Sequence, residues 1–396
     1  MANGGMRSEL ECLGRTTLSA SGSRPSNAVG ERSLPVYQPD LSGNERAYVM
    51  QAFDSTWISS RGEFLDRFEA AIASRIGTQY VSAVCNGTAA LHVALHCLNL
   101  QPGDEVIVPS FTYIASVNTI VQAGGTPVFA EVREDDWLLD PDDVRRRITP
   151  RTRAIMPVHL YGLACDMDKL PEIAAEAGCV LIEDCAEALG TKWRGRQVGT
   201  FGRVSAWSFF GNKTVTTGEG GLVATTDPAF HRRMAIVKGQ GMDPERRYWH
   251  VELGFNYRMT NIAAAIGLGQ VERLDDILRC KRAIAAQYRA LLAGSGVTFQ
   301  VASDAVESSE WLISLLLPRG ADRTFIMQRL AHDRIETRPV FYCAHHMPPH
   351  YRPNLRLPIS EDIAARGISL PSYPKLSQAD IIRVCTSLTE ALGSKN

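Results

Sequence analysis

The chain has 396 residues, and at roughly 100–200 residues per domain this length corresponds to two or three domains. Its 42 basic and 43 acidic residues leave a formal net charge of −1, so nothing in the charge requires nucleic acid or an anionic membrane as a partner. No segment contains the roughly 20 consecutive apolar residues of a membrane span.

The N-terminal residues 1–33 are rich in glycine, serine and arginine and lack the apolar core of a secretory signal. We therefore expect them to form a flexible extension. The nine cysteines are scattered along the chain with no CxxC pair, which favours reduced thiols in a cytoplasmic protein over disulfides or zinc.

From residue 34 onward, amphipathic helical segments alternate with short apolar runs. The pattern predicts helices over 62–76 and 115–122, and a further helix that Asn86, Gly87 and Thr88 open. The predicted strands are 105–110, 127–132, 153–162 and 179–184. Strands joined by helices predict an α/β fold, with a mostly parallel sheet covered by helices on both faces.

The pattern changes in the last third of the chain. A long helical region is predicted over residues 261–292, and the apolar run 311–318 suits a buried strand. A helix over 322–332 follows, so this part resembles a smaller α+β unit. We predict a large domain over 34–275 and a small C-terminal domain over 276–396.

One lysine lies in a loop of small and hydroxyl residues, SFFGNKTVTTGEGG (208–221). A Walker A loop requires G-x-x-x-x-G-K-[ST], and here Asn212 precedes Lys213, so that interpretation fails. The other use of a loop lysine is as an amine nucleophile that forms a Schiff base, which implies pyridoxal phosphate as the cofactor.

Partners for such a cofactor are present in the chain. Asp184 closes the strand 179–184, where a carboxylate can keep the pyridine nitrogen protonated, although a helix-capping role is the alternative. Gly87 and Thr88 can offer backbone N–H groups to the phosphate, or simply open a helix. Ser208 can add a hydroxyl. Phe111 can supply an apolar face for the ring, or pack in the core.

Six segments carry a resemblance to a known family. They are CNGTAALHVAL, GDEVIVPSFTYIASVN, MPVHLYGLACDMD, IEDCAEALGT, SFFGNKTVTTGEGG and GFNYRMTNIAAAIG. Together they resemble the DegT/DnrJ/EryC1/StrS family of nucleotide-sugar aminotransferases, over roughly residues 34–390.

The resemblance implies the aspartate-aminotransferase fold (fold type I), with a mostly parallel seven-stranded sheet, and a homodimer with shared active sites. Lys213 matches the lysine that binds pyridoxal 5′-phosphate and shuttles the proton. Asp184 matches the partner of the pyridine nitrogen, and Glu187 matches the residue near the phenolic oxygen. Asn256 matches the asparagine that reaches the phosphate of the partner subunit.

The remaining matches concern the phosphate and the ring. Ser208, Gly87 and Thr88 match phosphate ligands, and Phe111 resembles the stacking aromatic residue. His159, in VHLYG, is a candidate for a place beside the site.

Two positions bear on the branch of the family. Relatives that are 3-dehydratases carry histidine in place of the Schiff-base lysine, so Lys213 favours an aminotransferase. Cys343 stands where the family usually has proline, in a loop expected to line the sugar-nucleotide cleft.

The resemblance implies GDP-4-keto-6-deoxy-D-mannose as acceptor and L-glutamate as amino donor. A 3-keto sugar nucleotide is the alternative acceptor, and a non-catalytic regulator with the same fold is a remote alternative. We expect no metal, because His92 and His96 lack the glutamate of a metalloprotease motif.

Overall fold

The structure, a computed structural model, describes residues 32–394, and from Ser33 onward the chain forms one compact unit. Almost all of the expected extension, residues 1–33, lies outside the described residues. The division into two domains near residue 275 stays a prediction. In the described part of the chain, no helix is both long enough and apolar enough to cross a membrane.

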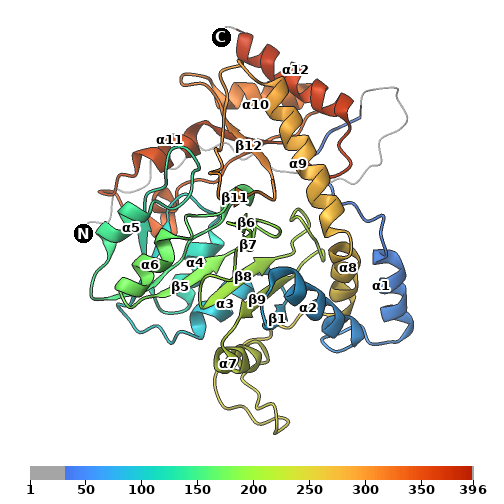
Figure 1. Ribbon diagram of the computed structural model, residues 1–396, viewed down its shortest axis with the longest axis vertical. Coiled ribbons are helices and arrows are strands. Elements are labelled where there is room, and N and C mark those ends of the chain that lie inside the picture. Colours follow the sequence, from blue (N-terminus) through green and yellow to red (C-terminus); the bar gives the residue numbers. More distant parts are fainter. Residues whose placement is uncertain (1–31, 395–396) are drawn as a thin grey trace, which may run out of the picture. The chain divides into compact units, whose positions relative to one another are not determined.

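A seven-stranded sheet lies at the centre of Figure 1, as expected for this fold class. Its strands, in order across the sheet, are β1 (Tyr80–Val84), β9 (Gly221–Thr225), β8 (Val204–Ser208), β5 (Val180–Asp184), β4 (Thr152–Ile155), β2 (Glu105–Pro109) and β3 (Thr126–Ala130). Only β9 runs antiparallel to its neighbours β1 and β8. The carboxyl ends of the other six strands therefore meet at one edge of the sheet.

Helices cover both faces of this sheet. The strands carry apolar side chains on both faces, and each face has to be buried. One face packs against α3 (Gly87–His96), α4 (Ala115–Gln122) and α7 (Pro228–Lys238). The other face packs against α2 (Glu63–Ile76), α6 (Lys169–Glu176) and α8 (Asn261–Val271). α1 (Glu45–Asp54) lies against α8, and α5 (Pro141–Arg147) contacts α6 and β3.

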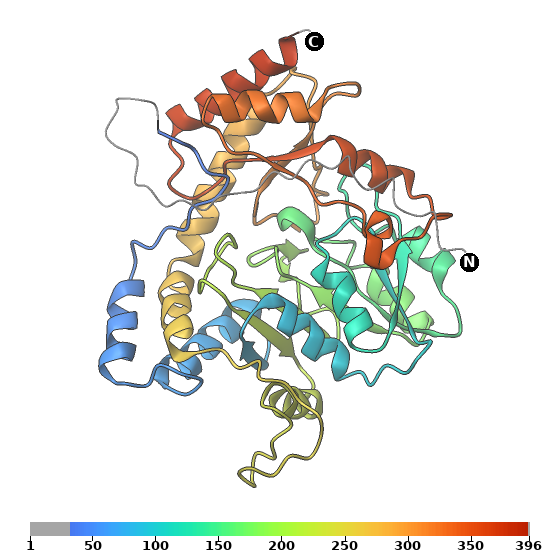
Figure 2. The same ribbon diagram turned by 180° about the vertical axis from the view of Figure 1, so that it is seen from behind.

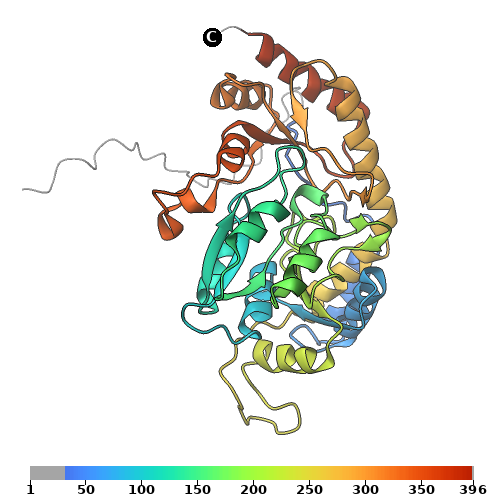
Figure 3. The ribbon, with the colours of Figure 1, turned by 60° about the vertical axis from the view of Figure 1, so that its left-hand side comes forward.

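A second, antiparallel sheet belongs to the C-terminal part of the chain. Its strands are β10 (Thr298–Phe299), β12 (Ile313–Leu316), β14 (Gly367–Leu370) and β13 (Arg338–Pro339). The helices of this part are α9 (Leu274–Leu291), α10 (Arg323–His332), α11 (Pro358–Arg366) and α12 (Gln378–Gly393). Figures 2 and 3 show α9 running from the end of α8 to these C-terminal elements.

The remaining elements are short. β11 (Val306–Glu307) pairs with β6 (Lys192–Trp193), which pairs with β7 (Arg196–Gln197). The 3-10 turns are η1 (Leu160–Gly162), η2 (Ala344–His346) and η3 (Pro348–His350).

Two expected elements differ from the structure. The predicted strand 153–162 ends as a regular strand at Ile155, although Pro157, which has no N–H to donate, still accepts the N–H of Asp184 at 2.9 Å and Val158 forms an isolated bridge with Asp184. The predicted helix 261–292 is two helices, α8 and α9, that are separated at Glu272 and Arg273. Arg273 turns to bind the carboxylate of Asp40 at 2.8 Å.

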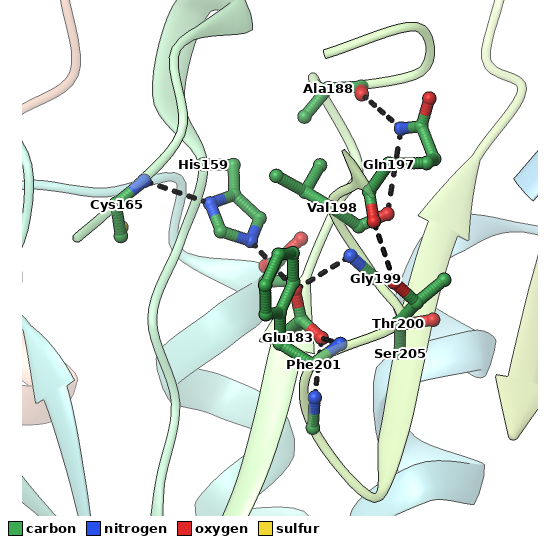
Figure 4. A network of polar contacts seen from close by, with 12 residues as sticks. His159, Cys165, Glu183, Ala188, Gln197, Val198, Gly199, Thr200, Phe201 and Ser205 are labelled. Carbon is green, nitrogen blue, oxygen red and sulfur yellow. Dashed lines mark hydrogen bonds and ion pairs between the residues drawn. The ribbon is translucent and has the colours of Figure 1, made fainter. Parts of the chain in front are cut away.

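The carboxyl end of β5 is fixed by the fully buried carboxylate of Glu183 (Figure 4). It accepts hydrogen bonds from the backbone N–H groups of Gly199, Phe201 and Gly202 at 2.6–2.7 Å. It also accepts one from His159 Nε2 at 3.2 Å. Every partner is a donor, so the two carboxylate oxygens of Glu183 accept all four of these hydrogen bonds.

The histidine in this network has a defined tautomer. His159 Nδ1 accepts the N–H of Cys165 at 3.1 Å, so the ring proton is on Nε2, which donates to Glu183. The backbone N–H of His159 donates to the carbonyl of Asp184 at 3.0 Å. The network thus holds the strand end that carries Asp184.

A buried lysine joins α9 to the N-terminal segment of the described chain. Lys281 Nζ donates to the Ser372 carbonyl at 2.8 Å and lies 5.0 Å from the ring centroid of Tyr37. Burial lowers the pKa of Lys281 to about 7, and the charge of Glu310 opposes the shift. The Tyr37 hydroxyl donates to the Lys213 carbonyl at 2.8 Å, so this contact supports the lysine loop.

We expect Glu183→Gln to lower the free energy of unfolding by about 2–4 kcal/mol, because an amide presents two further N–H donors to backbone donors. Urea unfolding measures the change. The control is Glu307→Gln, which removes an exposed pair with Lys192 and should cost less than about 1 kcal/mol. If both variants lost the same unfolding free energy, the Glu183 network would not stabilise the fold more than an exposed ion pair does.

The folded protein holds Lys281 at a lowered pKa, whereas the unfolded chain keeps the ordinary value near 10.5. Between these values the unfolded state binds more protons, so stability rises with pH above about 7. From pH 7 to pH 9 the parent should gain roughly 2 kcal/mol of unfolding free energy relative to Lys281→Met. If the difference in unfolding free energy between the parent and Lys281→Met did not change with pH, the lowered pKa of Lys281 would be refuted.

Candidate active site

Lys213 lies in the loop that joins β8 to the antiparallel strand β9. Its Nζ is 3.2 Å from Glu187 Oε1 and 3.9 Å from the ring centroid of Trp311. The side chain of Lys213 is only 13% exposed. The loop itself is closed by a hydrogen bond from Phe209 N to the Gly220 carbonyl at 2.8 Å. The lysine amine therefore has a fixed place at the carboxyl edge of the sheet.

Asp184 ends β5 and is almost fully buried. Its carboxylate accepts hydrogen bonds from Ser116 Oγ at 2.7 Å and from Ala186 N at 3.0 Å. Burial raises the pKa of Asp184, while the two hydrogen bonds and the nearby charge of Lys213 act in the opposite direction. A cationic group in front of this carboxylate would further favour its ionised form.

Glu187 follows β5 by three residues and bridges two parts of the site. Its Oε1 contacts Lys213, and its Oε2 accepts the N–H of Tyr161 at 3.0 Å. Burial raises the pKa of Glu187, and the charge of Lys213 opposes the rise. Tyr161 has a left-handed backbone with φ of 55°, which lets its N–H point at the carboxylate.

The N-terminus of α3 forms a small cradle beside these groups. The Asn86 side chain caps Ala89 N at 2.8 Å, which leaves the N–H groups of Gly87 and Thr88 without an acceptor inside the helix. A Cβ atom at Gly87 would lie 2.7 Å from Ser208 Cβ and 2.9 Å from Ser208 Oγ. Only glycine leaves this space open, and its backbone donors and the serine hydroxyl suit an anion.

These parts line one cavity with a volume of about 440 Å³. The sequence-predicted residues that line it are Gly87, Thr88, Asp184, Glu187, Ser208 and Lys213. The cavity therefore combines a lysine amine, two buried carboxylates and an anion cradle.

Three predicted residues lie elsewhere. Phe111 is fully buried and does not line the cavity, because the chain turns after β2 and points its ring toward Tyr161, 6.4 Å away between centroids. Tyr113, two residues later, lines the cavity and is 56% exposed. His159 lies behind the site in the Glu183 network. Asn256 is exposed and is not among the lining residues.

Sequence analysis missed several lining residues, among them Trp311 and Phe341. Trp311 was interpreted only as part of a buried strand, and it precedes β12 with its ring against Lys213. Phe341 follows β13, and its ring lies 5.6 Å from that of Tyr113. Nothing local in the sequence marks them, since both come from the C-terminal part of the chain.

A histidine cluster near the site has direct partners. His345 Nε2 faces the acceptor Glu361 Oε1 and so carries the ring proton, which leaves Nδ1 to accept a hydrogen bond from Ser110 Oγ at 2.7 Å. His345 Nε2 and His346 Nε2 lie 3.2 and 3.5 Å from Glu361 Oε1. The carboxylate thus accounts for the grouping of the two rings.

Comparisons with known proteins identify the family of this chain. The model of the DegT/DnrJ/EryC1/StrS aminotransferase family matches residues 39–389. A protein of Escherichia coli O157:H7 named GDP-perosamine synthase is 48% identical, over 91% of this chain and 99% of its own length. A Vibrio cholerae protein of the same name is 46% identical, over 90% of this chain and 98% of its own.

Solved structures show the same fold. DesV from S. venezuelae is 34% identical with a TM-score of 0.85, over 92% of this chain and 100% of its own. The putative sugar aminotransferase Spr1654 from Streptococcus pneumoniae, in its PMP form, is 27% identical with a TM-score of 0.87, over 91% of this chain and 98% of its own. The chain described here belongs to the DegT/DnrJ/EryC1/StrS aminotransferase family.

Proposed function

We propose that this protein is a pyridoxal phosphate-dependent aminotransferase that converts GDP-4-keto-6-deoxy-D-mannose and L-glutamate into GDP-perosamine and 2-oxoglutarate. The observation that carries the aminotransferase chemistry is the Lys213 amine, 3.2 Å from the Glu187 carboxylate, in a cavity that Asp184 also lines. The choice of sugar rests on the relatives named GDP-perosamine synthase, which match this chain over nearly their whole length.

The residues of the cavity fit pyridoxal phosphate. The open space at Gly87, the N–H groups of Gly87 and Thr88 and the hydroxyl of Ser208 suit its phosphate. The buried carboxylate of Asp184 suits its ring nitrogen. We propose that Tyr113 would contact the ring in place of Phe111, because Tyr113 lines the cavity and Phe111 does not.

When bound, pyridoxal phosphate carries an amino group between carbonyl compounds and withdraws electrons from the carbon that exchanges its proton. Lys213 would hold the cofactor through a covalent bond to Nζ. Once released by the amino donor, the same Nζ would take a proton from, or return it to, the carbon that loses or gains nitrogen.

The two carboxylates do different work. Asp184 would keep a proton on the cofactor's ring nitrogen, and its bonds to Ser116 and Ala186 hold it in place for this. Glu187 would keep the free Lys213 amine near the reacting carbon, since it contacts Nζ and is itself held by Tyr161 N. The burial of both groups also limits the access of water.

We further propose a homodimer in which Asn256 reaches the phosphate site of the partner. This asparagine is exposed and outside the cavity of its own chain. The preceding segment extends away from the sheet in Figure 3 and exposes Tyr248, Trp249, Val251 and Leu253.

We also propose a cytoplasmic location. It agrees with the cysteines of residues 32–394, all of which are free thiols.

The acceptor is tested by incubating the purified protein with GDP-mannose, its 4,6-dehydratase, L-glutamate and pyridoxal phosphate. We expect equal amounts of 2-oxoglutarate and GDP-perosamine, the latter identified by NMR. A 3-keto sugar nucleotide is tested in parallel. Product from the 3-keto sugar alone would overturn the proposed acceptor while leaving the aminotransferase chemistry in place.

Lys213→Ala should lower kcat by roughly 10³-fold or more, because the covalent anchor and the proton carrier are lost together. Its melting temperature should stay close to that of the parent. In the parent, borohydride reduction followed by peptide mass spectrometry should find the cofactor on Lys213. The exposed Lys192→Ala is the control and should keep full activity. An active Lys213→Ala protein would refute the mechanism.

A further inference from the structure

Trp311 makes two separate contacts with the lysine loop. Its ring centroid lies 3.9 Å from Lys213 Nζ, well within the distance of a cation–π interaction. Its indole Nε1 donates a hydrogen bond of 2.7 Å to the carbonyl of Asn212, the residue before Lys213. One side chain therefore contacts both the reactive amine and the main chain that carries it.

The position of Trp311 is itself tightly fixed. A Cβ atom at Gly162 would lie 2.7 Å from the backbone nitrogens of both Glu310 and Trp311, so the two segments are in close contact. Ser309 N donates to the Gly162 carbonyl at 3.1 Å. The ring of Tyr161 is stacked on that of Trp311, with centroids 6.0 Å apart and planes at 13°. Trp311 is consequently only 3% exposed although it lines the cavity.

The turn that fixes Trp311 also fixes Glu187. Tyr161 N donates to Glu187 Oε2, and Glu187 Oε1 contacts Lys213 Nζ. The amine thus has two contacts, a carboxylate and a ring face, and both depend on the turn at Tyr161 and Gly162. A lysine amine on a flexible four-carbon stem would otherwise sample many positions.

We propose that Trp311 is a positioning residue for the Lys213 amine: its ring face holds the ammonium group in the cavity, and its indole N–H fixes the loop at Asn212. This inference rests on the proposed role of Lys213 as anchor and proton carrier. Trp311 acts while Lys213 Nζ is free of the cofactor and carries the proton that it has taken up, because the ring face attracts the charged ammonium group. Proton transfer therefore depends on Trp311, whereas substrate binding does not.

The test compares Trp311→Leu, which removes both contacts, with Trp311→Phe, which keeps a ring face but removes the N–H donor. The control is Trp193→Phe, which removes the bond of another buried indole to Asp168, away from the cavity. Three quantities are measured: the rate at which apoprotein captures pyridoxal phosphate, from the absorbance of the bound cofactor; kcat and KM for each substrate; and the melting temperature.

Trp311→Leu should lower kcat and the capture rate by about 2- to 30-fold, the range expected for one cation–π contact, with both KM values within about twofold of the parent. Trp311→Phe should lower them less, and Trp193→Phe should leave them unchanged. Unchanged kcat and capture rate in Trp311→Leu would overturn the proposal, as would a rise of KM alone. The proposal would also be overturned if Trp193→Phe lowered kcat and the capture rate as much as Trp311→Leu does, with the two variants melting at the same temperature.

Failure of the proposed function gives a different result. In that case borohydride fixes no cofactor on Lys213 of the parent protein. If the parent is labelled at Lys213 and Trp311→Leu behaves as the parent does, only the role of Trp311 is refuted.

Discussion

The candidate active site depends on keeping charged side chains largely buried. Asp184, Glu187 and Lys213 line one cavity together, and a buried charge is costly unless it is paired and hydrogen-bonded. Each carboxylate therefore takes a backbone N–H, from Ala186 and Tyr161 respectively. The second of these bonds requires a left-handed residue, a conformation that costs of order 1–3 kcal/mol. The surrounding fold stabilises that conformation.

The parallel sheet is what brings these groups together. Residues that follow β5 and β8 lie side by side because the two strands are adjacent and parallel. The single antiparallel strand, β9, returns the chain directly after the lysine loop and so keeps both ends of that loop at the same edge. Behind this edge, Glu183 and His159 tie β5 to two neighbouring loops, which makes the strand end rigid without adding a reacting group (Figure 4).

Much of this could be predicted from the sequence, for identifiable reasons. Asp184 closes an apolar run, and Gly87 and Thr88 open a helix after one, so local pattern placed them correctly at strand and helix ends. Phe111 was predicted as the ring contact and Tyr113 was not considered, since the direction of each side chain after β2 depends on the turn that the chain makes there. Trp311 could not be found, because its contact with the site is tertiary and its surrounding sequence is that of a buried strand.

The contacts of the lysine loop bear on how the protein is made. Tyr37 is 176 residues from Lys213, and Trp311 is 99 residues from Asn212, yet these two side chains hold successive carbonyls of the loop. A nascent chain leaves the ribosome with its N-terminus first. The seven strands of the large sheet are complete at Thr225, but the loop gains its last support only after residue 311 has emerged. The support of the lysine loop is therefore completed only after all seven strands of the large sheet have emerged.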